Sequence, residues 1–92
     1  MSHQATFYEA DISHPNILTL AEEPSLKDGI IWRRYRRQHI VSVTVESTSG
    51  LALAIETTSG LAVFRPDPEI SCEEFLDQAL LVEQWLELEQ TA

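Results

Sequence analysis

The chain has 92 residues, a net charge of −9 at pH 7, 43% hydrophobic residues and one cysteine. One cysteine excludes an internal disulfide, no run approaches the roughly 20 apolar residues of a membrane span, and the first residues lack the basic and apolar blocks of a signal peptide. We therefore expect one cytoplasmic domain over residues 1–92, with a core of modest size and no membrane segment.

The N-terminal segment, residues 1–26, gives the weakest signals, and we expect it to be irregular. The residues around Phe7 are compatible with a short strand. Pro15 predicts a turn, because proline pushes the preceding residue into an extended conformation. Residues 16–21 are apolar but few, so an edge strand and a helical turn both remain open for them.

Residues 30–39 interleave arginines with aromatic rings, and they contain four of the six basic residues of the chain. The candidate binding residues here are Trp32, Arg33, Arg34, Tyr35, Arg36 and Arg37. They could bind a protein partner, or bind nucleic acid by pairing arginines with phosphates and stacking rings on bases. Alternatively, they form a charged edge strand whose arginine stems cover apolar surface. The negative net charge argues against nucleic acid.

The same segment gives little indication of where its strands end. No glycine, proline, asparagine or aspartate lies between Ile30 and Val45. We expect one long, bent or bulged strand that begins after the turn at residues 27–29. The alternative is a loop near Arg37 and Gln38 that separates two strands.

A ten-residue repeat, residues 46–53 and 56–63, predicts a tight antiparallel meander. With three-residue loops ending at Gly50 and Gly60, both glycines have positive φ. Val43 then lies opposite Ile55, and Ile55 lies opposite Val63. This register collects the large aliphatic residues on one face: Val41, Val43, Val45, Leu51, Leu53, Ile55, Leu61 and Val63. The other, solvated face carries Ser42, Thr44, Glu46, Ala52, Ala54, Glu56 and Ala62.

The last segment, residues 71–90, predicts a helix. Ser71 and Glu74 have the spacing of a capping box, and no glycine or proline follows. A main apolar stripe, expected to cover the aliphatic face of the sheet, consists of Phe75, Ala79, Val82 and Leu86. A second stripe consists of Leu81, Trp85 and Leu88. We expect the second stripe to bind a partner or a second copy with Trp85 as anchor, unless the N-terminal segment folds over it.

Charge is unevenly distributed, because residues 67–92 carry eight carboxylates and no basic side chain. This surface is either a solvated face or a contact for a basic partner. The histidines are too far apart to suggest a metal site, Cys72 stands alone, and the three glycines all fall in turns. We therefore expect no enzyme, no catalytic residue, no metal and no cofactor.

These observations predict an α+β domain in which an antiparallel β-meander of three to five strands, within residues 29–66, packs on one C-terminal helix. As a function they favour a small non-catalytic protein-interaction or regulatory module that binds a protein partner, with a homodimer as one arrangement. One alternative is a nucleic-acid-binding module that uses Trp32 to Arg37. Another is an acidic inhibitor or antitoxin-like protein that masks a basic target.

Overall fold

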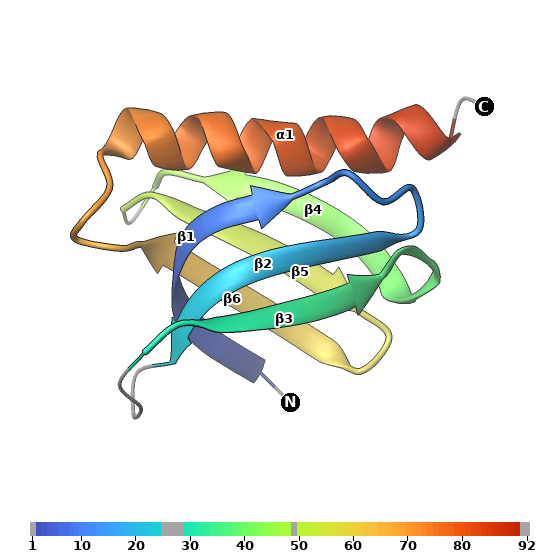
Figure 1. The fold of residues 1–92 in the computed structure, drawn as a ribbon, viewed down its shortest axis with the longest axis horizontal. Helices are drawn as coiled ribbons and strands as arrows, with labels where there is room; N and C mark the ends of the chain where they lie inside the picture. Colours follow the sequence, from blue (N-terminus) through green and yellow to red (C-terminus); the bar gives the residue numbers. More distant parts are fainter. Residues whose placement is uncertain (1, 25–28, 49, 91–92) are drawn as a thin grey trace.

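The computed structural model describes residues 2–24, 29–48 and 50–90 of the chain. In this part the chain forms six strands, a short 3₁₀ helix and one α-helix (Figure 1). Their bounds are β1 Ser2–Asp11, β2 Ile17–Pro24, β3 Ile31–Arg36, η1 Arg37–His39, β4 Ile40–Glu46, β5 Ala52–Thr57, β6 Gly60–Pro66 and α1 Cys72–Gln90. The α+β class is confirmed. The expected three to five strands were too few, because residues 1–26 contain two long strands.

The six strands form one sheet in the order β3-β2-β1-β6-β5-β4. The β1 and β6 strands run parallel, and every other neighbouring pair is antiparallel. The two edge strands, β3 and β4, are joined by η1 alone, which has three residues. A connection this short can join opposite edges only if the sheet is strongly curled, and Figure 1 shows this curvature.

The prediction of one continuous strand from Ile30 to Val45 was wrong, and the alternative of a break near Arg37 is confirmed. Backbone hydrogen bonds fix the break at both ends of η1. The Arg37 N–H donates to the Asn16 carbonyl at 2.9 Å, and the Thr58 N–H donates to the His39 carbonyl at 2.9 Å. Hydrogen bonds to segments that are distant in the sequence therefore stabilise this turn. For this reason no glycine, proline, asparagine or aspartate marks the turn locally.

The first hairpin of the meander has the predicted register, since Val43 lies opposite Ile55 and Val45 opposite Leu53. Gly50 has a φ of +105°, as predicted. Ser49, within the same loop, lies outside the described residues. A bulge between Ile40 and Ser42 leaves Val41 58% exposed, so its predicted place on the inner face was wrong.

The second hairpin has a different register from the predicted one. Thr57 pairs with Gly60 around a two-residue turn, so Ile55 lies opposite Ala62 rather than Val63. This shift buries Phe64 completely and turns Leu61 to solvent. The Thr57 side chain stabilises the tighter turn by donating to the Gly60 carbonyl at 2.9 Å. Burial of a large aromatic ring thus outweighed the symmetry of the repeat, although Gly60 still has a positive φ of +138°.

The helix begins as predicted, with the Ser71 hydroxyl accepting a hydrogen bond from the Glu74 N–H at 3.1 Å. Phe75, Ala79 and Val82 of the main stripe are fully buried, and Leu86 is partly buried. The helix makes its most extensive contacts with β1 and β4 (Figure 1). The Phe75 ring meets the Phe7 ring of β1 edge-on, with centroids 5.5 Å apart, so the core includes the N-terminal strand that was expected to be irregular.

The connection from β6 to α1 depends on Asp67, a buried carboxylate. It accepts a hydrogen bond from the Thr6 hydroxyl at 3.1 Å and another from the Glu69 N–H at 2.9 Å. Its own N–H donates to the Phe7 carbonyl at 3.3 Å. Asp67 thereby connects the start of the helical segment to β1.

No helix in the described part of the chain is long and apolar enough to cross a membrane.

Candidate partner-binding surface

The structure divides the candidate residues of β3 between the two faces of the sheet, and each face carries both an aromatic and a basic residue. Tyr35 lies opposite Leu18 and Arg33 opposite Leu20, and both leucines are fully buried. Residues that pair directly across two strands share a face, so Arg33 and Tyr35 belong to the inner face of the curled sheet. Trp32, Arg34 and Arg36 alternate with them on the outer face. The six candidate residues therefore do not form one surface.

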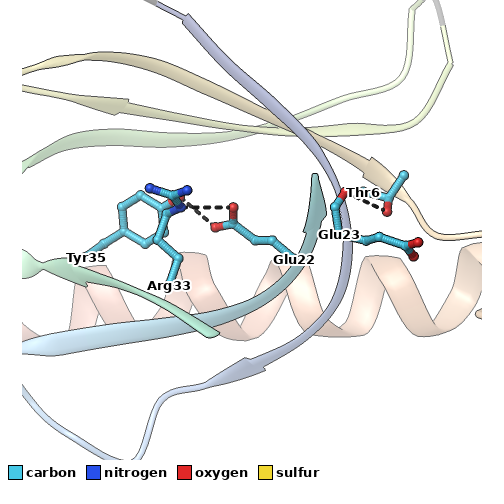
Figure 2. Close-up of polar contacts among 5 residues, drawn as sticks. All are labelled: Thr6, Glu22, Glu23, Arg33 and Tyr35. Atoms are coloured by element: carbon cyan, nitrogen blue, oxygen red, sulfur yellow. Dashed lines mark hydrogen bonds and ion pairs between the residues drawn. The ribbon is translucent and has the colours of Figure 1, made fainter. Parts of the chain in front are cut away.

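On the inner face, Arg33 and Tyr35 bind the carboxylate of Glu22, which has no solvent exposure (Figure 2). The Arg33 Nε lies 3.3 Å from one carboxylate oxygen, and the Tyr35 hydroxyl donates to the other at 2.6 Å. Burial, together with the adjacent carboxylate, raises the pKa of Tyr35 well above its ordinary value. The sequence analysis missed Glu22, although the alternation of Leu18, Leu20 and Glu22 would have placed it on the inner face.

A second polar contact lies beside this cluster in Figure 2, where the Thr6 hydroxyl donates to the Glu23 carbonyl at 3.4 Å. The Glu23 side chain accepts a hydrogen bond from the Tyr8 hydroxyl at 3.0 Å. Desolvation and this hydrogen bond raise the pKa of Tyr8 above its ordinary range. These contacts join β1 to β2.

Arg37 holds the C-terminal half of the helix against the β1–β2 turn. Its guanidinium donates to the carbonyls of Trp85 at 2.9 Å and Leu86 at 3.1 Å, and its Nε donates to the Pro15 carbonyl at 2.8 Å. The guanidinium carbon also lies 3.8 Å from the centroid of the Trp85 ring, a cation–π contact. Arg37 is therefore occupied by contacts within its own chain.

Trp85 is only 5% exposed, so it is not available as the anchor of an interface. Its indole N–H donates to the His14 carbonyl at 2.9 Å, and Arg37 covers its ring. This corrects the prediction of a Trp85-anchored contact and agrees with its alternative, in which the N-terminal segment folds over the residue. Leu81 of the same predicted stripe is exposed, and the side chain of Leu88 lies outside the described residues.

The outer face of β3 keeps three residues without such contacts. Trp32 is 55% exposed, and Arg34 and Arg36 are exposed beside it. Among the described residues, no hydrogen bond or ion pair holds the side chain of Arg34 or Arg36. A surface hollow of about 460 Å³ adjoins Arg36 and is also lined by Asn16 and Gln38. We call Trp32, Arg34 and Arg36 the outer β3 surface.

The remaining titratable residues do not gather into a metal site in the part of the chain that the structure describes. No group of three or more histidine, cysteine or carboxylate side chains could hold a metal ion there. Cys72 is exposed at the start of α1. Comparison with protein-family models, curated proteins and solved structures found no significant match.

Proposed function

We propose that this chain is a non-catalytic protein-binding module whose binding surface is the outer β3 surface. The observation that carries the proposal is the exposed Trp32, which lies on one face with two arginines that have no partner among the described residues. Tryptophan and arginine are the residues most enriched among interface hot spots. Residues two apart in a strand are about 6.6 Å apart, so one partner can contact all three side chains.

Nucleic acid is less well supported as the ligand of this surface. Two of the four arginines of the segment, Arg33 and Arg37, already bind groups of their own chain. Only Arg34 and Arg36 remain for phosphates, on a chain with a net charge of −9. Nucleic-acid-binding domains usually carry a larger basic surface.

A second surface supports the alternative of an acidic inhibitor. The outer face of α1 exposes Leu76, Leu80 and Leu81, with Leu80 47% exposed. The helix carries carboxylates such as Asp77 and Glu87 and no basic residue. A basic target could cover these leucines, so the test of the proposal includes this face.

The test is a pull-down with the tagged chain at low and high salt, with and without nuclease. We expect a stoichiometric protein partner to be retained by the wild type and lost by Trp32→Ala. The matched control is Leu61→Ala, which shortens an exposed apolar residue on β6. Equal recovery by Trp32→Ala and the wild type would refute the proposal. Loss with Leu80→Ala alone would favour the acidic-inhibitor alternative, and recovery of nuclease-sensitive material would favour nucleic acid.

A further inference from the structure

The backbone of β3 directs alternate amide groups toward and away from β2. The Arg37 N–H donates to the Asn16 carbonyl, and the same register pairs Arg36 with Ile17 and Tyr35 with Leu18. In an antiparallel ladder, hydrogen-bonded and non-hydrogen-bonded pairs alternate. Because the pair of residues 16 and 37 is hydrogen-bonded, residues 35, 33 and 31 also bond to β2. The amide groups of Trp32 and Arg34 therefore point to the opposite edge.

This opposite edge is the outer edge of the sheet, because β3 is its terminal strand. Figure 1 shows β3 at the lower front of the molecule, with α1 along the upper side. The residues that direct amide groups to the free edge are also those that expose their side chains on the outer face. A ligand that lies along β3 can therefore meet the backbone and the side chains of Trp32 and Arg34 together.

A second copy of this chain is a poor occupant of the edge. Antiparallel pairing of β3 with itself would bring the arginines of one copy opposite those of the other, and like charges directly opposite destabilise a strand pair. An extended segment with carboxylates would instead place opposite charges beside Arg34 and Arg36. At physiological salt, charges are screened over about 8 Å, so the charged side chains nearest the bound segment, Arg34 and Arg36, contribute most to its selection.

We propose that β3 binds an extended acidic segment of a partner protein, which adds to the sheet as a seventh strand. This inference rests on the proposed function and specifies its partner. Strand addition gains affinity from main-chain hydrogen bonds and specificity from alternate side chains. Here the main-chain bonds come from Trp32 and Arg34, and the selection for acid comes from Arg34 and Arg36.

The first test is amide hydrogen exchange of the free protein. We expect the amides of Trp32 and Arg34 to exchange fast, because they lack a partner in the sheet, and those of Arg33 and Tyr35 to be protected by β2. The two pairs are neighbours in one strand, so each is a control for the other. Equal protection of all four amides would overturn the proposal, because the edge would then already be occupied.

The second test uses a capped octapeptide of alternating glutamate and valine as the probe. We expect it to bind and to slow exchange at Trp32 and Arg34. The same peptide N-methylated at its glutamates loses the N–H groups that would face β3, because a residue hydrogen-bonded to Arg34 lies on the same face as Arg34, and we expect it to bind about tenfold more weakly. The Arg34→Glu, Arg36→Glu double variant should lose the glutamate peptide and bind its lysine counterpart. Binding of the methylated and unmethylated peptides with equal affinity would overturn strand addition.

The outcomes separate this inference from the proposed function. If Trp32→Ala loses its protein partner while the glutamate peptide fails to protect the edge amides, the surface binds protein but not as an added strand, and only the inference fails. If an oligothymidylate shifts the resonances of Trp32 and Arg34 while the peptide does not, the ligand is nucleic acid and both proposals fail. If the glutamate peptide protects the edge amides and Trp32→Ala still binds the protein partner, strand addition at β3 is supported and the role of Trp32 as the anchor of the interface is refuted.

Discussion

Replacing Arg37 by alanine should destabilise the fold, because this side chain joins the helix to the β1–β2 turn. The substitution removes three hydrogen bonds to the carbonyls of Pro15, Trp85 and Leu86, and the cation–π contact with Trp85. It also removes a positive charge from carbonyls in the last turns of α1, where the helix dipole favours a cation. The three carbonyls lose a donor at the same time.

The expected cost is about 2–4 kcal/mol. Each hydrogen bond contributes roughly 0.5–1.5 kcal/mol, and the cation–π contact adds about 0.5–1 kcal/mol, without full additivity. This is a large fraction of the ~5–15 kcal/mol that stabilises a typical domain, and it corresponds to a fall in Tm of ~8–30 °C. Urea unfolding followed by circular dichroism measures the free energy directly. In a Trp32→Phe background, the fluorescence of Trp85 should also shift to the red as its ring becomes exposed.

The adjacent Arg36 is the matched control, since its side chain is exposed and has no partner among the described residues. Arg36→Ala should change the free energy of unfolding by less than about 0.5 kcal/mol. Arg37→Lys keeps the charge but loses the planar guanidinium, so it should recover only part of the stability. Equal stabilities of Arg36→Ala and Arg37→Ala would refute the assignment of Arg37 as a structural residue.

Four further predictions concern the core, the ionisation of tyrosine, the first hairpin and assembly. Phe75→Ala should cost about 3–5 kcal/mol in urea unfolding, against less than about 1 kcal/mol for the exposed neighbour Leu76→Ala, and similar costs would contradict the packing of α1. Burial raises the folded-state pKa of Tyr35, so its contribution to stability is complete below the unfolded pKa of about 10 and is lost as pH rises further. In a spectroscopic pH titration, the native protein should form tyrosinate at a higher pH than the denatured chain. The Tyr35→Phe variant should lose less stability at alkaline pH than the wild type. Gly50→Val should cost about 1 kcal/mol or more, because φ is +105° and an added Cβ would lie 3.2 Å from the Arg65 guanidinium; an unchanged Tm would show that the loop relaxes freely. Sedimentation at neutral pH should show a monomer, because self-contact through α1 would bring the carboxylates of two copies together, and a dimer abolished by Leu80→Glu would contradict this.

The parts of the fold that local signals control could be predicted from the sequence. Ser71 and Glu74 marked the helix start, and the spacing of Phe75, Ala79 and Val82 identified the buried stripe. Gly50 identified the first turn, since its positive φ follows from a local backbone requirement. The helix and the first hairpin were therefore predictable without knowledge of tertiary contacts.

The missed features depend on contacts between distant segments. The β1 strand is stabilised by Phe7 packing on Phe75 and by parallel pairing with β6, neither of which leaves a local signal. The break at Arg37 depends on a carbonyl of the β1–β2 turn. For the candidate site, the sequence singled out residues 30–39, but it could not divide their arginines between structural and exposed positions, because that division depends on where Glu22 and Trp85 lie.

The division of the arginines narrows what the segment can do for a partner. Arg33 balances a buried carboxylate and Arg37 holds the helix, so both contribute to folding whether or not a partner exists. The side chains of Arg34 and Arg36 have no hydrogen bond or ion pair among the described residues, and Trp32 is 55% exposed on the same face of this edge strand. Charged side chains on an edge strand also discourage pairing with other copies. Protection of the edge against pairing with other copies therefore explains the two arginines. It does not explain Trp32, because a large exposed apolar ring favours association. This difference is the physical reason why we propose a partner for the outer β3 surface.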